Sequence, residues 1–180
     1  MTVSVSAVSS AALAVALSVA GLSAQAPANP FGASAARVET MHLSVAPSVS
    51  ATEVAPGKSV TVAFDVAPKR TMHVYAPGDH DYQVVTVSVD ARPWLKVQPL
   101  AYPASEIYHF KELNEKVEVY SKPFTLRQEV TLLSTPEARK ALAGSSRVTV
   151  SGHLEYQACD DKVCYSPKKV PFSFTVDVAQ

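Results

Sequence analysis

The chain has 180 residues, of which 47% are hydrophobic and 18% charged, a composition typical of one domain of ordinary size with a packed core. The 16 Lys and Arg residues balance 16 Asp and Glu residues, so net charge provides no attraction for nucleic acid or an anionic membrane surface. Two cysteines are too few for a disulfide-rich miniprotein or a four-cysteine zinc site, but they are enough for one redox pair.

The N-terminal segment predicts a signal peptide over residues 1–26. This segment carries no charged side chain, and Ala7 to Leu22 is mostly Ala, Val, Leu and Ser. Ala24 and Ala26 are small residues at the two positions that a signal peptidase reads, and an uncleaved membrane anchor is the alternative. Residues 27–37 read as a flexible leader. We therefore expect a periplasmic or otherwise exported protein, in which a thiol pair can be oxidised.

Residues 38–180 predict one all-β domain. Hydrophobic residues alternate with polar ones over 59–66, 85–89 and 170–178, as in strands with one buried face. Weaker strand patterns cover 38–45, 72–76, 95–101, 117–120, 123–132 and 146–158. Strands at this spacing predict an antiparallel β-sandwich. Pro171 indicates a sheet edge, and one short connecting helix is expected over 136–144, after the N-cap Thr135.

The two cysteines, Cys159 and Cys164, frame the sequence CDDKVC at the expected tip of a hairpin between the last two strands. Facing residues of an antiparallel pair have Cα atoms about 4.5–5.5 Å apart, within the range of about 4.4–6.8 Å that a disulfide tolerates. A disulfide is therefore sterically plausible.

Three roles are open for this pair: a structural staple, a redox-active disulfide, or a metal site. Closing so small a ring stabilises by about 2 kcal/mol, against about 4 kcal/mol for a bridge across some 60 residues. Zinc is disfavoured because no second cysteine pair exists. Asp160 and Asp161 disfavour a thiolate whereas Lys162 favours one, so we expect an ordinary thiol pKa and exchange that depends on an activated partner thiolate.

The segment YQACDDKVCYSP (residues 156–167) resembles the redox motif of the N-terminal domain of the thiol:disulfide interchange protein DsbD. The resemblance extends to residues 72–77, to a cap segment over 102–114 and to the strand after it, and so covers most of 38–178 in order. It implies an immunoglobulin-like fold whose disulfide is opened and closed by partner proteins.

The resemblance also implies roles for single residues. Cys164 matches the cysteine that forms the mixed disulfide with partners, and Cys159 matches the one that resolves it. Leu113, or alternatively Phe110, matches the shielding residue of the cap. Candidate cap or partner contacts are thus Phe110, Leu113, His73, Tyr75, Tyr156 and Tyr165. This chain has four residues between its cysteines, where the best-known family member has five.

The expected function is therefore exchange of electrons between thioredoxin-like redox proteins through a reversible Cys159–Cys164 disulfide. A membrane electron-transfer protein is a possible further partner. We expect no cofactor, no metal, no nucleic acid and no small-molecule substrate. The alternative function is a non-catalytic immunoglobulin-like binding domain in which the hairpin disulfide is structural.

Overall fold

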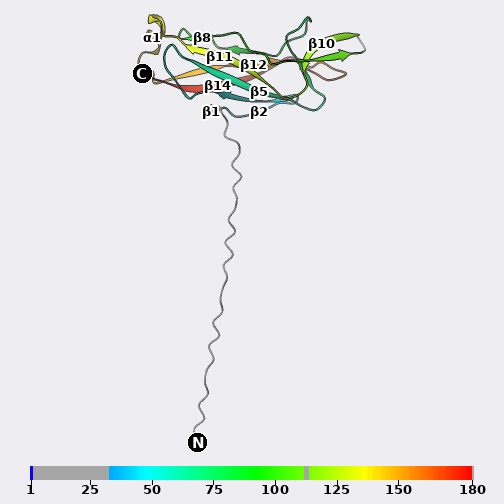
Figure 1. Cartoon of the computed structure of the whole chain (residues 1–180), viewed down its shortest axis with the longest axis horizontal. Helices are drawn as coiled ribbons and strands as arrows, with labels where there is room; N and C mark the ends of the chain where they lie inside the picture. Colours follow the sequence, from blue (N-terminus) through cyan, green and yellow to red (C-terminus); the bar gives the residue numbers. More distant parts are fainter. Residues whose placement is uncertain (2–32, 112–113, 180) are drawn as a thin grey trace.

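A computed structural model describes residue 1 and residues 33–111 and 114–179 of the chain. The described part is built mainly from short strands, with one helix (Figure 1). In chain order the elements are β1 (Ala33–Ser34), β2 (Val38–Glu39), β3 (Leu43–Val49), β4 (Glu53–Val54), β5 (Ser59–Pro68), β6 (His73–Tyr75), β7 (Thr86–Val89), β8 (Leu95–Val97), β9 (Glu106–Phe110), β10 (Glu115–Tyr120), β11 (Phe124–Leu132), α1 (Pro136–Leu142), β12 (Arg147–Tyr156), β13 (Ala158–Cys159) and β14 (Lys168–Val178).

Two sheets form an immunoglobulin-like β-sandwich, which confirms the predicted fold class. The first sheet has the order β1-β3-β5-β11-β8, with β2 also paired to β3, and the second has the order β4-β14-β12-β7. The predicted alternation is present in both, because β5 and β14 each bury every second side chain in one shared core. Phe64 of β5 and Phe172 of β14 meet there edge to face, with ring centroids 4.8 Å apart.

A third, smaller sheet with the order β13-β6-β10-β9 extends the molecule at one end (Figure 1). Its strand β9 lies in the segment that the sequence suggested as a cap, and it pairs antiparallel with β10. Strand β9 has no buried face that a sequence pattern could reveal: Ile107 is 60% exposed, and no position of this strand is fully buried. Pairing with β10, rather than burial, therefore establishes this strand.

The last long strand also agrees with the prediction for Pro171. Its partner on one side is β12, where Pro171 faces His153, while β4 joins the other side only at Asp177 and Val178. Pro171 can lack an N–H here because, among the described residues, no strand pairs with that other side at its position.

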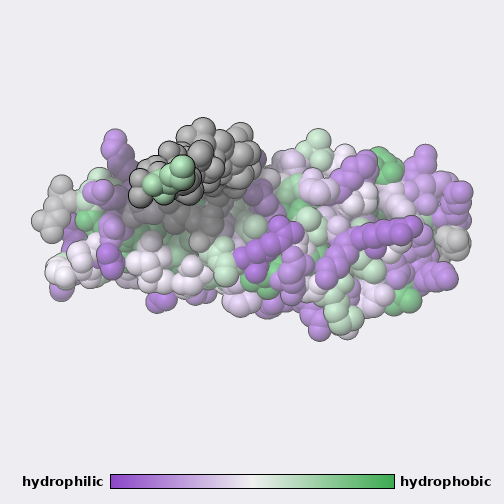
Figure 2. All heavy atoms as spheres, turned by 90° about the horizontal axis from the view of Figure 1, so that it is seen from below, coloured by the Kyte–Doolittle hydropathy of each residue, from purple (hydrophilic) through white to green (hydrophobic). Residues whose placement is uncertain are grey.

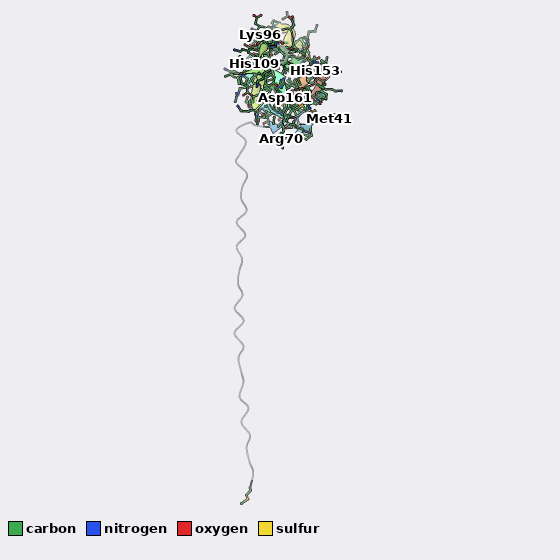
Figure 3. All side chains as sticks on the ribbon, turned by 90° about the vertical axis from the view of Figure 1, so that its right-hand side faces the viewer. Met41, Arg70, Lys96, His109, His153 and Asp161 are labelled. Atoms are coloured by element: carbon green, nitrogen blue, oxygen red, sulfur yellow. A yellow bond between two sulfur atoms is a disulfide. The ribbon has the colours of Figure 1, made fainter. Side chains whose placement is uncertain are left out.

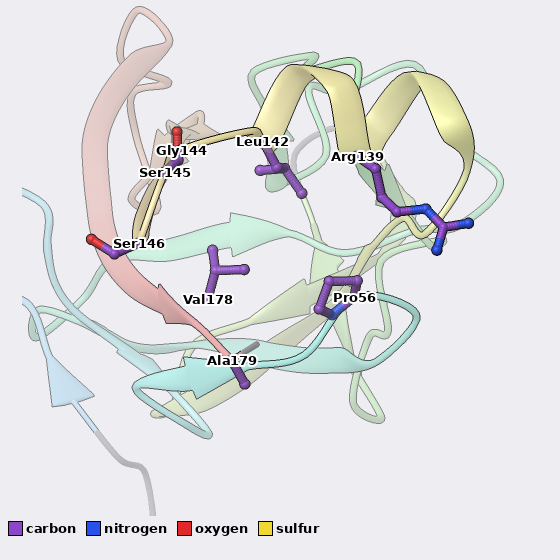
Figure 4. Close-up of a pocket in the computed structure, with 8 residues that line it drawn as sticks. All are labelled: Pro56, Arg139, Leu142, Gly144, Ser145, Ser146, Val178 and Ala179. Carbon is purple, nitrogen blue, oxygen red and sulfur yellow. The ribbon is translucent and has the colours of Figure 1, made fainter.

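The predicted helix forms as α1 at the end of the molecule opposite β10 (Figure 1). The Thr135 hydroxyl accepts a hydrogen bond from the N–H of Ala138 at 3.2 Å, and Gly144 adopts a left-handed φ of 77° after the last turn. A surface pocket of about 290 Å³ lies beside this helix, and Leu142 and Val178 point toward one another across it (Figure 4). This pocket is far from the cysteines.

The predicted leader, residues 27–37, overlaps the described chain at its end, where β1 pairs with β3. The Arg37 guanidinium also donates a hydrogen bond to Glu39, at 2.8 Å. These last residues of the leader are therefore held by pairing with the edge of the first sheet. The remainder of the leader and the predicted signal peptide lie outside the described residues.

On the face seen in Figure 2, hydrophobic side chains form separate spots among hydrophilic ones.

Candidate functional site

Cys159 and Cys164 form a disulfide with an S–S distance of 2.09 Å and a Cα–Cα distance of 4.1 Å. The two residues face each other as an antiparallel bridge, as predicted for the hairpin tip. Between β12 and β14 the chain leaves the sandwich, and β13 pairs with β6 of the third sheet, where Cys159 lies opposite His73. The disulfide therefore lies where the second and third sheets meet.

The two cysteine residues differ in exposure. Cys159 is buried, with 0% of its surface exposed, whereas Cys164 belongs to the exposed residues. Val163, just before Cys164, is 51% exposed. Cys164 is therefore the more accessible of the two cysteines from outside the protein.

The turn between the cysteines is organised by Asp160. Its carboxylate accepts hydrogen bonds from the N–H groups of Lys162 and Val163, both at 2.8 Å, and from the Tyr165 hydroxyl at 3.1 Å. The backbone N–H of Lys162 and then that of Val163 are the main causes that lower the pKa of Asp160. The ionised carboxylate therefore shapes the turn and places negative charge beside the disulfide.

Tyr75 of β6 contacts both sulfur atoms. Its hydroxyl donates a hydrogen bond to Cys159 Sγ at 3.3 Å and lies 3.5 Å from Cys164 Sγ. The side chain is 2% exposed, and burial, followed by the neighbouring Tyr82, raises the pKa of Tyr75 to about 12. The phenol therefore remains protonated, and remains a donor, at neutral pH.

His73 lies under the cap segment rather than on the surface. Its ring is 3% exposed and stacks on Tyr108 of β9, with centroids 4.7 Å apart. Burial lowers the pKa of His73, while Asp161 and then Asp160 oppose that effect. Its Nε2 atom is buried and has no hydrogen-bond partner among the described residues.

Tyr108 connects β9 to the disulfide loop. Its hydroxyl donates a hydrogen bond to the Asp161 carboxylate at 2.7 Å, and its ring meets Phe110 edge to face at 6.0 Å. Figure 3 views the molecule from the β10 end, where Asp161 of the loop and His109 of β9 are labelled. Phe110 is thus connected to the site through Tyr108, and Leu113 lies outside the described residues.

The two flanking tyrosines of the motif have different surroundings. The Tyr165 ring packs against that of His42, with centroids 4.4 Å apart, and its hydroxyl donates a hydrogen bond to Asp160, so it supports the disulfide loop from one side. Tyr156 is fully buried and donates a hydrogen bond to Thr40 at 2.9 Å, so it belongs to the core of the sandwich.

Two tyrosines of the site were not among the sequence-based candidates. Tyr108 could have been found, since it lies two residues before Phe110 and so shares its face of a strand. Tyr82, which stacks on Tyr75 at 4.2 Å, carries no local signal because its contact depends on the third sheet.

Neither a metal centre nor a membrane span stands out in the described part of the chain. Residues 33–111 and 114–179 contain no cluster of three or more His, Cys, Asp or Glu side chains able to hold a metal ion. Over the same ranges, no helix has both the length and the apolar character needed to cross a bilayer.

Comparison with known proteins identifies the family. Residues 42–175 match the family described as thiol:disulfide interchange protein DsbD, N-terminal. The fold is similar to the crystal structure of the N-terminal periplasmic domain of ScsB from Proteus mirabilis, with a TM-score of 0.53 and 13% identity over 81% of this chain. The likeness covers 51% of that chain, so this protein spans about half of its length. No curated protein sequence matches. The chain therefore belongs to the DsbD N-terminal family of thiol–disulfide exchange domains.

Proposed function

We propose that the domain passes electron pairs between thioredoxin-like redox proteins through the reversible Cys159–Cys164 disulfide. In the oxidised protein, a partner thiolate attacks Cys164 Sγ, the bond to Cys159 breaks, and Cys159 leaves as a thiolate. The second thiol of the same partner then attacks the partner's sulfur in the mixed disulfide. This step releases Cys164 as a thiolate and leaves the partner with a disulfide. Two electrons have then moved to this domain.

The reduced domain donates the electrons by the reverse chemistry. The Cys164 thiolate attacks a disulfide of the next protein and forms a mixed disulfide. Cys159 then attacks Cys164 Sγ, the intramolecular disulfide forms again, and the next protein leaves with both of its cysteines reduced. The observation that carries this division of roles is that Cys164 is exposed while Cys159 is fully buried.

The family and the similar fold support the proposed partners and location. Thioredoxin-like proteins, and a membrane electron-transfer protein as a further candidate, supply the activated thiolate that this site does not produce by itself. The ScsB domain with a similar fold is periplasmic, which supports the same location for this chain, as the predicted signal peptide does. Balanced charge argues against nucleic acid as a partner, and we expect neither a cofactor nor a small-molecule substrate.

The β9–β10 hairpin acts as a cap that limits access to the disulfide until a partner docks. The contacts that support this role are the hydrogen bond from Tyr108 to Asp161 and the stacking of Tyr108 on His73. Phe110 of β9 is one candidate shielding residue, and Leu113, which lies outside the described residues, is the other.

Trapping of mixed disulfides tests the exchange reaction. The variant Cys159→Ala keeps the accessible sulfur and cannot resolve, so it should accumulate a mixed disulfide with a thioredoxin-like protein. Its matched control, Cys164→Ala, keeps only the buried sulfur and should not. Equal trapping by both variants would contradict the division of roles. A wild-type disulfide that no thioredoxin-like protein reduces would favour the structural alternative.

The variant Tyr108→Phe tests the cap, because it removes only the hydroxyl that donates to Asp161. We expect a small thiol such as dithiothreitol to reduce the disulfide of this variant faster than that of the wild type. Tyr120→Phe is the control, since that hydroxyl bonds to the carbonyl of Pro103 instead. An unchanged rate in Tyr108→Phe would argue against a closing role for this contact.

A further inference from the structure

The buried sulfur of the disulfide has a phenol as its hydrogen-bond donor. When Cys164 is attacked, negative charge develops on Cys159 Sγ, which is 0% exposed and so receives no stabilisation from bulk water. The carboxylates of Asp160 and Asp161, in the loop between the cysteines, make that charge still less favourable. Among the described residues, the Tyr75 hydroxyl donates a hydrogen bond to this sulfur at 3.3 Å.

We propose that Tyr75 is a catalytic residue of the exchange reaction, which donates a hydrogen bond to the thiolate that forms on Cys159. This inference rests on the proposed function. The same contact acts in both directions, because Cys159 must also become a thiolate before it resolves a mixed disulfide. A donor matched to charge that appears only during the reaction accelerates exchange rather than stabilising the resting disulfide.

The ring of Tyr75 is held so that its hydroxyl stays at the sulfur. One face stacks on Tyr82, with centroids 4.2 Å apart and planes 4° from parallel, and His73 meets its edge at 5.7 Å. The neighbouring β10 strand pairs with β6, where Tyr75 lies opposite Val119. The donor is therefore positioned before the reaction begins, which is the condition for effective electrostatic stabilisation.

Tyr75 donates the hydrogen bond and keeps its proton. Its pKa is about 12, raised by burial, Tyr82, Glu115 and Tyr108 in that order. An ordinary thiol has a pKa of about 8.5, so transfer of the phenolic proton to the Cys159 thiolate is unfavourable. The proton that Cys159 finally binds comes from the partner thiol or from solvent, and the proton count of the reaction balances.

The test is Tyr75→Phe, which keeps the ring and its stacking, with Tyr120→Phe as the matched control. The Tyr120 hydroxyl donates to the carbonyl of Pro103 at 2.8 Å and not to sulfur. Loss of a hydrogen bond to a charged group should slow reduction of Tyr75→Phe by dithiothreitol, and by a thioredoxin-like protein, roughly 10- to 100-fold. Its equilibrium constant with glutathione at pH 7 should change less than about threefold, since both stable states are uncharged at Cys159.

A second measurement separates this role from a structural one. In a Cys164→Ala background, the thiolate absorbance of Cys159 is titrated with and without Tyr75→Phe. With Tyr75→Phe present, the Cys159 thiol should ionise only at about tenfold lower proton concentration. Replacing Tyr75 with 4-aminophenylalanine, which retains a donor, should restore the rate.

Three results would overturn the proposal while leaving exchange intact: a rate in Tyr75→Phe within twofold of the wild type, equal slowing in Tyr120→Phe, or an unchanged Cys159 titration. A wild-type disulfide that does not exchange at all would instead refute the proposed function itself. The two failures are therefore distinguishable, because only the second one appears in the unmodified protein.

Discussion

Reduction of the disulfide should lower the free energy of unfolding only slightly. The cysteines are separated by 5 positions in the sequence, and the chain-entropy relation gives about 2 kcal/mol for a ring of this size. For a domain of this size, the loss corresponds to a fall in melting temperature of about 4–8 °C. Reduction by itself removes no side-chain volume, so no cavity term adds to this figure.

The loop should keep its shape in the reduced protein, because other contacts hold it. Ala158 and Cys159 remain paired with Val74 and His73 of β6, and both are buried. Asp160 still accepts the two N–H groups of its turn. A disulfide that shuttles between states requires such a scaffold, since each turnover passes through the open form.

The measurement is urea denaturation of the oxidised and the reduced protein, followed by circular dichroism under conditions that block reoxidation. We expect a lower midpoint with an unchanged m-value, as for a loss of stability without a change in compactness. A loss above about 4 kcal/mol, or unfolding of the third sheet on reduction, would exceed what ring closure explains. The disulfide would then act as a structural staple.

Two further predictions concern stability. A Cβ at Gly152 would overlap the backbone carbonyl of Ser88, so Gly152→Ala should lower the free energy of unfolding by about 1–3 kcal/mol or more in thermal denaturation. At Gly78 the nearest atoms belong to the flexible Glu118 side chain, so Gly78→Ala should lower it by less than about 0.5 kcal/mol. A loss of stability as large in Gly78→Ala would refute this steric argument. His73 has a folded pKa below 6.5, so the unfolded chain binds the extra proton, and stability should be full above about pH 6.5 and fall as the pH drops below it. His73→Asn should flatten that fall in denaturation midpoints, and an unchanged slope would contradict burial as its cause.

Most of the sandwich could be predicted from local sequence patterns. Alternation over 59–66 and 170–178 identified β5 and β14 together with their buried faces, because a strand with one face in a core must alternate. Thr135 and Pro136 likewise marked the start of α1, since capping depends on neighbouring residues alone. Strand β9 was not recognised as a strand, since its side chains lack a buried face and its pairing is with β10.

The cysteine pair was also a local feature. Cys159 and Cys164 are close in the chain, and their expected positions on facing strands of a hairpin made a disulfide sterically plausible, which the structure confirms. Its likeness to a known redox motif then indicated the family, which the match over residues 42–175 established.

Only the tertiary structure decided how the two sulfur atoms differ. Strand β13 pairs with β6 of the third sheet and not with the sandwich, which buries Cys159 and leaves Cys164 exposed. Nothing in the sequence CDDKVC itself distinguishes the two cysteines. Tyr75 reaches Cys159 across 84 positions of sequence, and Tyr108 reaches Asp161 across 53. Such contacts depend on which strands become neighbours, whereas a sequence pattern reports only which face of a strand is buried.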